Sequence, residues 1–225
     1  MTETYIHSKK QITLGIGLIL FLFIAPIVLG YLGILKTNRN ISSLVIHELY
    51  VWFILFFVYI YATKIEKRKL LILSEIDISF KQTLKNIFRL ILSFVGISIT
   101  VNVILHLTGN KNDSVYIQKL VPIFRQYKVI IPFIAITAGV VEELVFRAYL
   151  FPRFEELFKN TDIAIILSAT LFGILHISYG TIAQIAVPFL FGVVTALHYK
   201  KHRNIKTLIF THFLWDFLLL CKTVL

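Results

Sequence analysis

The sequence contains a single cysteine, Cys221. This scarcity excludes an intrachain disulfide and any metal site built from several cysteines. Proline and glycine are also sparse, at 5 and 10 of 225 residues, and they form no linker. The chain has no internal repeat and no low-complexity tract. We therefore expect one integrated domain.

Acidic residues are few, with 12 Asp and Glu against 23 Lys and Arg, which gives a formal net charge of +11. In a soluble protein this excess would suggest a nucleic-acid partner, but no basic face is interleaved with aromatic residues. Hydrophobic residues make up 57% of the chain, and the mean hydropathy is +0.81. This composition indicates that lipid is the solvent and excludes an ordinary soluble domain. We expect membrane lipid, and not nucleic acid, to surround the protein.

Long apolar runs recur along the chain, and a helix needs about 20 apolar residues to cross a bilayer. They predict an all-α, polytopic membrane protein with seven or eight transmembrane helices. The fifth run is short because Gly173 and His176 interrupt it, so it is either tilted or partly re-entrant. The seven expected spans are Gln11–Leu35, Leu44–Ala62, Asn86–Leu107, Val129–Phe151, Ile163–Ile177, Ile182–Tyr199 and Ile205–Val224.

The polar segments between the spans predict the topology. Leu70–Lys85 mixes apolar and charged residues and is expected to lie on the membrane surface, although an eighth membrane segment there would change the side of the C-terminus. Lys and Arg are more frequent in the loops on the side of the N-terminus, which places that terminus in the cytoplasm. The residues expected outside are fewer, namely Lys36, Arg39, Lys111, Lys119, Arg125, Lys128 and Lys222.

The fourth expected span carries three ionisable residues, Glu142, Glu143 and Arg147. Each ionisable group within a span costs roughly 2.5–3.5 kcal/mol on insertion scales, so such groups usually face the protein interior and serve a function. Glu143 and Arg147 are four residues apart and can form an ion pair on one helical face. Glu142 lies about 100° around an α-helix from Glu143. One carboxylate can therefore be neutralised while the other remains available as a general base, although the Glu143–Arg147 pair can equally serve only to tie helices together.

Two further spans carry polar residues at depth. Phe172 and His176 in the fifth span are four residues apart, as are His212 and Asp216 in the seventh. Each pair therefore shares a helical face. We expect the three spans to converge on one polar chamber.

These residues form three motifs in order: EExxxR from Glu142 to Arg147, FxxxH from Phe172 to His176, and Hxxx(N/D) from His212 to Asp216. The pattern resembles the CPBP family of CAAX-processing and bacteriocin-processing intramembrane proteases, also called the type II CAAX endopeptidase or Abi family. The resemblance covers roughly Val129–Leu220. It implies a catalytic core in residues 126–222, preceded in residues 1–125 by N-terminal helices and the surface segment.

The resemblance also implies roles for the four candidate catalytic residues. Glu142 and His176 would activate a water molecule for attack on a peptide carbonyl, while His212 and Asp216 would stabilise the oxyanion. Many members of the family carry Asn where this chain has Asp216, and an ionised Asp cannot donate a hydrogen bond. Asp216 is therefore either protonated or orients His212, and we favour the second. The residues Glu143, Arg147 and Phe172 would support the site.

Cofactor use is open at the level of sequence. The set Glu142, His176, His212 and Asp216 could hold zinc with one open position, and the family has been described both as metalloproteases and as metal-free glutamate proteases. The chain has no HExxH motif, since Val51 stands where His47-Glu48 would need a second His. We expect no tightly bound metal.

The expected function is an intramembrane endopeptidase for a hydrophobic, leader-type or lipid-anchored peptide, in the plasma membrane of a bacterium. One alternative is a non-proteolytic bacteriocin-immunity or regulatory scaffold that uses the polar cluster for binding. Another is a small transporter with a Glu-His proton relay. The transporter is disfavoured because the chain has no internal repeat and no paired broken helices.

Overall fold

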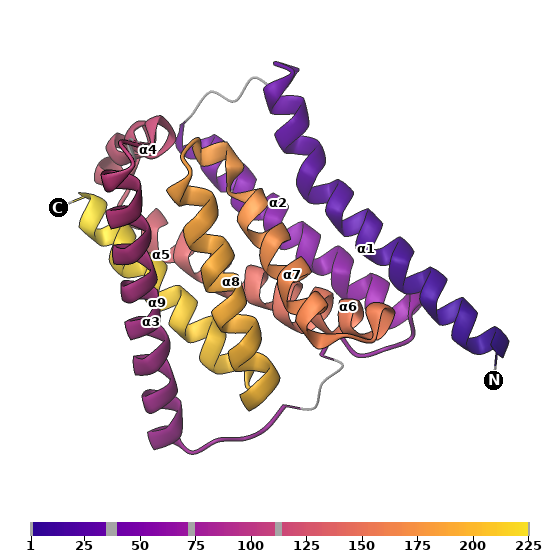
Figure 1. Ribbon diagram of the computed structural model, residues 1–225. Coiled ribbons are helices and arrows are strands. Elements are labelled where there is room, and N and C mark those ends of the chain that lie inside the picture. Colours follow the sequence, from indigo (N-terminus) through magenta and orange to yellow (C-terminus); the bar gives the residue numbers. More distant parts are fainter. Residues whose placement is uncertain (1, 35–39, 72–74, 111–113, 225) are drawn as a thin grey trace.

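The computed structural model describes residues 2–34, 40–71, 75–110 and 114–224, and in these residues it is helical and has no strand (Figure 1). The prediction of an all-α fold is confirmed. Several residues assigned to a span or a loop from the sequence lie outside the described residues, namely Leu35, Lys36, Arg39 and Lys111. The elements are α1 (Thr2–Tyr31), α2 (Ile41–Ile60), η1 (Tyr61–Ile65), α3 (Phe80–Leu107), α4 (Val115–Gln126), α5 (Ile130–Thr137), η2 (Ala138–Leu150), α6 (Phe151–Phe158), α7 (Thr161–Leu175), η3 (Ile177–Tyr179), α8 (Ala183–His202) and α9 (Ile205–Val224).

Several helices begin at side chains that can accept a hydrogen bond from the first turn. Asn40 caps α2, Ser79 caps α3 and Asn160 caps α7. The last turn of α8 ends at Arg203, whose φ is 44°. This left-handed residue stops the helix and turns the chain into α9.

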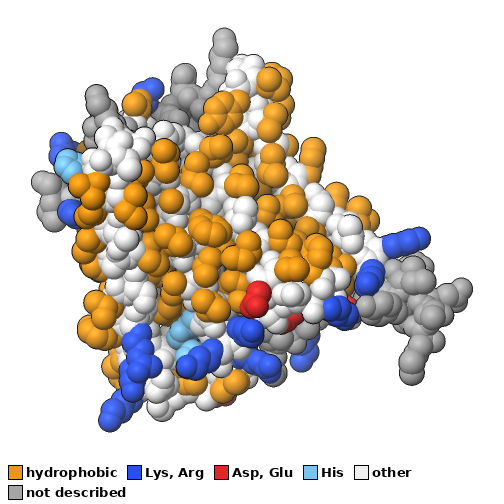
Figure 2. All heavy atoms as spheres, viewed as in Figure 1, with side chains coloured by type: hydrophobic (Ala, Val, Ile, Leu, Met, Phe, Trp, Pro, Cys, Tyr) orange, Lys and Arg blue, Asp and Glu red, His pale blue; other side chains and the backbone are white. Residues whose placement is uncertain are grey.

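Five helical segments of the described chain are long and apolar enough to cross a membrane: Lys9–Tyr31, Ile41–Ile65, Phe80–Leu107, Thr161–Tyr179 and Ile205–Val224. Figure 2 shows hydrophobic side chains spread over the middle of one face, with Lys and Arg gathered mainly at its edges. This distribution is that of an integral membrane protein.

The other two expected spans are helical but are not among these five. The fourth corresponds to α5 and η2, which contain three charged residues, and the sixth corresponds to α8, which ends in Lys200, Lys201 and His202. A total of seven or eight spans therefore stays a prediction, as does the cytoplasmic N-terminus.

In the core, η2 packs against α9, and α7 packs along α8. Gly139 permits the close contact between η2 and α9, because a Cβ atom there would lie 2.8 Å from the carbonyl oxygen of Ile209 and 2.9 Å from the backbone nitrogen of Phe213. Small residues allow helices in a membrane to approach closely. Glu142 and Glu143, one turn after Gly139, are thereby brought next to His212.

Residues 66–79 link η1 to α3 without forming a helix in their described part, and we call them the α2–α3 strap. The sequence placed them in an amphipathic surface segment, Leu70–Lys85. Its residues 72–74 lie outside the described part of the chain, its residues 75–79 form no regular element, and residues 80–85 already belong to α3. A location of this segment on the membrane surface stays a prediction. In Figure 1 the described parts of the strap lie at the lower edge, one after η1 and the other before α3.

The strap is held by hydrogen bonds to the turn between α8 and α9. The Glu75 carboxylate accepts from the Tyr199 hydroxyl at 2.8 Å and from the Ile205 backbone N–H at 2.6 Å. The Ile76 backbone N–H donates to the Arg203 carbonyl at 2.8 Å. Because Glu75 lies at the N-terminus of α9, its negative charge also stabilises the helix dipole.

Candidate active site

The EExxxR motif lies in η2, a π-helix of 13 residues. The sequence predicted ordinary α-helical geometry here, and that expectation is wrong over residues 138–150. In a π-helix each carbonyl bonds five residues ahead, and such segments are rare and frequently found at functional sites. The wider turn still leaves the side chains of Glu143 and Arg147 close enough to form an ion pair.

Glu143 is fully buried and contacts the side chains of Arg147 and His212. Its Oε1 lies 3.2 Å from Arg147 Nη1 and accepts a hydrogen bond from His212 Nδ1–H at 2.8 Å. A buried carboxylate is stable only when it is paired and hydrogen-bonded in this way. Glu143 is thus neutralised by its neighbours and holds the orientation of the His212 ring.

Arg147 is also fully buried, and it contacts three elements. Its Nε donates to Thr195 Oγ1 on α8 at 2.9 Å, and its guanidinium lies 4.3 Å from the centre of the Phe172 ring on α7. With the ion pair to Glu143, these contacts join η2, α7 and α8. The helix-tying role considered from the sequence is therefore present in the structure.

Glu142 has different surroundings from Glu143, although the two are neighbours in sequence. Its side chain is about a quarter exposed, at 24%, and Oε2 has no hydrogen-bond partner among the described residues. That oxygen lies 3.7 Å from His212 Nε2, and Asp216 Oδ2 lies 3.5 Å from the same nitrogen. These separations are those of an ion pair, and exceed a direct hydrogen bond.

His176 stands directly at the end of α7, where the helix passes into η3. Its Nδ1–H donates to the Phe172 carbonyl at 2.8 Å. A carbonyl oxygen can only accept, so in the neutral ring Nε2 carries no proton and can accept one. The Phe172 ring lies 5.0 Å from the His176 ring and 6.1 Å from the His212 ring, and it thereby links the residues of α7 and α9.

The structure thus places Glu142, Glu143, His212 and Asp216 in direct contact range, and the Phe172 ring contacts the rings of both His212 and His176. One polar chamber shared by all four candidate catalytic residues stays a prediction. No contact tests the catalytic role of any of them, and these roles stay predictions.

In the described residues, no group of three or more His, Cys, Asp or Glu side chains is close enough together to hold a metal ion. His212 Nδ1 contacts Glu143 and His176 Nδ1 contacts a backbone carbonyl, so the Nε2 atom of each ring is the one that faces a substrate, a water or an ion. His47 is exposed, and its Nδ1 atom lies 3.3 Å from Oε1 of its neighbour Glu48.

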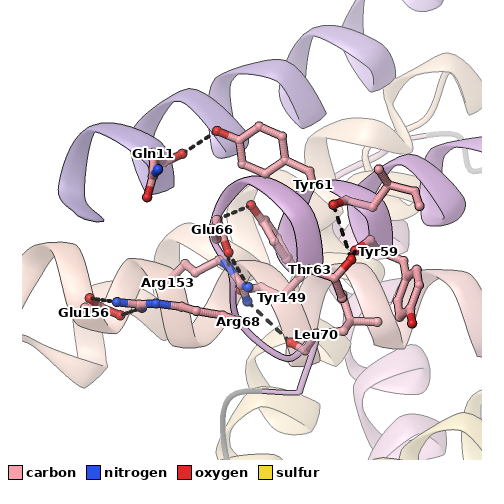
Figure 3. A network of polar contacts seen from close by, with 11 residues as sticks. Gln11, Tyr59, Tyr61, Thr63, Glu66, Arg68, Leu70, Tyr149, Arg153 and Glu156 are labelled. Atoms are coloured by element: carbon pink, nitrogen blue, oxygen red, sulfur yellow. Dashed lines mark hydrogen bonds and ion pairs between the residues drawn. The ribbon is translucent and has the colours of Figure 1, made fainter. Parts of the chain in front are cut away.

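A second buried ionic cluster was not foreseen from the sequence. Arg153 is fully buried and donates through Nε and Nη2 to Glu66 Oε2, at 2.8 and 2.5 Å. The Tyr149 hydroxyl donates to Glu66 Oε1 at 2.7 Å, and Figure 3 shows Tyr149 and Arg153 converging on Glu66. Glu66 and Arg153 are 87 positions apart, so no sequence spacing signals the pair.

This cluster fixes the far end of η2. Arg153 Nη1 also donates to the carbonyls of Tyr149 and Leu70, and Arg68 pairs with Glu156 on α6 (Figure 3). The first part of the α2–α3 strap is therefore bound to η2 and α6, while its last part is bound to the start of α9. The two elements that carry Glu142 and His212 are held by one segment.

The family model described as Rce1-like, type II CAAX prenyl endopeptidase Rce1-like, matches residues 124–218. The match is consistent with the CPBP/CAAX protease family and confirms the resemblance over these residues. At the level of the family it supports a CAAX-type intramembrane endopeptidase with a peptide substrate. No curated protein and no solved structure matches the chain.

Proposed function

We propose that this protein hydrolyses a peptide bond of a hydrophobic or lipid-anchored substrate within the membrane, using a water molecule activated by Glu142 and His176. The observation that carries the proposal is the unequal environment of the two adjacent glutamates. The Oε2 atom of each glutamate has no hydrogen-bond partner among the described residues. Glu143 is fully buried and its Oε1 is paired with Arg147 and His212, whereas the Glu142 side chain is 24% exposed and lies no closer than 3.7 Å to His212 Nε2. A general base needs a free lone pair that the water can reach.

The reaction is a general-base hydrolysis. The Glu142 carboxylate takes a proton from water while His176 Nε2 accepts the second O–H hydrogen bond and orients it. The water oxygen attacks the carbonyl carbon, and the electron pair of the C=O bond moves to the oxygen as an oxyanion. His212 Nε2–H donates a hydrogen bond to that oxyanion. The proton on Glu142 then passes to the amide nitrogen as the C–N bond breaks, which releases an amine and a carboxylic acid.

Asp216 is assigned to His212 and not to the oxyanion. Its carboxylate lies 3.5 Å from His212 Nε2, and Glu143 contacts Nδ1 on the other side of the ring. These two contacts support the proposal that Asp216 orients His212.

The test uses the purified full chain in nanodiscs with a library of quenched fluorescent peptides that includes prenylated and leader-type sequences. Glu142→Gln keeps the shape of the side chain but removes its basicity, so kcat should fall by roughly 10²–10⁴, the usual contribution of a general base. Asp77→Asn, which removes an exposed carboxylate of the strap, serves as the matched control and should cleave normally. Full activity of Glu142→Gln would refute the assignment.

A chelator arm tests the metal-free mechanism. Cleavage should continue after incubation with 1,10-phenanthroline, because no step uses a metal. Activity lost to the chelator and restored by zinc would contradict the proposed chemistry. A folded wild-type protein that cleaves no peptide of the library would favour the scaffold alternative.

A further inference from the structure

The oxyanion of the proposed reaction needs more than one hydrogen-bond donor, and the motif residues supply few. Glu142, Glu143 and Asp216 are acceptors when ionised. His212 has one N–H left for the substrate, because Nδ1–H is used by Glu143. Oxyanion stabilisation usually combines at least two fixed donors aimed at the developing charge. A neutral donor from outside the three motifs would complete the site.

Tyr179 is a second aromatic residue, besides Phe172, whose ring contacts the His176 ring. It ends η3, the single turn that follows α7, and its ring is stacked on the His176 ring with 5.6 Å between centroids and 20° between planes. Its hydroxyl has no hydrogen-bond partner among the described residues, although Glu142 and Asp216 both act on it electrostatically. A phenol is uncharged at neutral pH and can donate its O–H.

The position of this ring is fixed by several contacts. The Ser114 hydroxyl donates to the Tyr179 carbonyl at 2.6 Å, and the Tyr116 ring packs on the Tyr179 ring at 4.7 Å. Gly180, with φ of 83°, then turns the chain away towards α8. The short helix α4 thus holds Tyr179 in place, and a donor held in place costs no reorganisation during the reaction.

We propose that Tyr179 is a catalytic residue whose hydroxyl donates a hydrogen bond to the oxyanion, together with His212 Nε2–H. The inference rests on the proposed hydrolase function. No covalent bond to Tyr179 forms or breaks, and its proton stays on the phenol oxygen throughout. Tyr179 thereby supplies the donor that Asp216 cannot supply when it is ionised.

The experiment compares wild type, Tyr179→Phe and Glu142→Gln in nanodiscs, on the peptide that wild type cleaves fastest in the library. Tyr179→Phe keeps the stacked ring and removes only the hydroxyl. Loss of one oxyanion donor should lower kcat by roughly 10²–10³ while KM stays within about twofold, because the charge develops only in the transition state. Tyr127→Phe, at the exposed end of α4, is the matched control and should behave as wild type.

A second readout separates this role from a structural one. A phosphinic analogue of the same peptide carries an anionic oxygen where the oxyanion forms, so its inhibition constant should rise in Tyr179→Phe by about the same factor as kcat/KM falls. Unchanged kcat in Tyr179→Phe would overturn the inference, as would a lower kcat with unchanged inhibition by the analogue. If wild type cleaves no peptide, the hydrolase proposal itself fails, and that result is distinct from either of these.

Discussion

Gly139 is expected to control activity although it carries no side chain. A Cβ atom at this position would lie 2.8 Å from Ile209 O and 2.9 Å from Phe213 N, whereas an ordinary contact begins at 3.4 Å. Both opposing atoms belong to the backbone and cannot rotate away. Gly139→Ala must therefore move α9 away from η2 by about 0.5–0.6 Å, the amount by which these two distances fall short of 3.4 Å. Phe213 directly follows His212, so the displacement is passed to the site.

The consequence for the site follows from its shortest contact. The hydrogen bond between His212 Nδ1 and Glu143 Oε1 measures 2.8 Å, and the added separation would lengthen it to about 3.3–3.4 Å, where a hydrogen bond is weak. A misplacement of 1 Å can cost about 10²-fold in rate, so half of that displacement should lower kcat by about tenfold. Overpacking should also destabilise the protein by about 1–3 kcal/mol.

The assay measures peptide cleavage and thermal unfolding of the same nanodisc samples. Gly96→Ala is the matched control, because a Cβ atom at Gly96 on α3 would meet nothing within 4 Å. Alanine also favours the helix by about 1 kcal/mol over glycine, so this variant should keep full activity and melt slightly higher. Wild-type kcat in Gly139→Ala would refute the reasoning, because it would mean that η2 and α9 can separate without disturbing His212.

Two further predictions concern the α2–α3 strap. Arg153→Met leaves the buried Glu66 without its cation, which should destabilise the protein by about 3–5 kcal/mol. Thermal unfolding in detergent measures this loss, and an unchanged melting temperature would show that Arg153 does not hold Glu66. Glu75→Gln removes the charge from the hydrogen bond to the Ile205 N–H and should lower the free energy of unfolding by about 1.5–3 kcal/mol. Hydrogen exchange of the backbone amides should become faster in the first turn of α9, and exchange equal to wild type would contradict the contact.

The sequence predicted the helical class and the grouping of the polar residues because both depend on local spacing. The pairs Phe172–His176 and His212–Asp216 are four residues apart on single helices, so helical geometry alone places their members together. The ion pair of Glu143 with Arg147 was expected for the same reason, and it is present in the structure.

What the sequence did not predict depends on contacts between distant segments or on backbone geometry that has no spacing signal. The π-helical path of η2 cannot be read from EExxxR, since the same letters suit an α-helix. The pairing of Glu66 with Arg153 joins positions far apart, and the acidic residues of the strap resembled those of any surface segment. Tyr179 follows His176 by three residues, but only the short turn of η3 stacks the two rings.

The α2–α3 strap also has a consequence for biogenesis. Its acidic residues are synthesised well before their partners, since Glu75 precedes Ile205 by 130 positions and Glu66 precedes Arg153 by 87. Glu66 can therefore pair once η2 and α6 have been synthesised, whereas Glu75 has no Ile205 N–H to accept from until α9 follows. The Glu75 end of the strap thus closes last, and a nascent chain that stops before α9 has neither a complete site nor a locked one. Proteolysis of such an incomplete chain by quality-control enzymes would begin at this open segment.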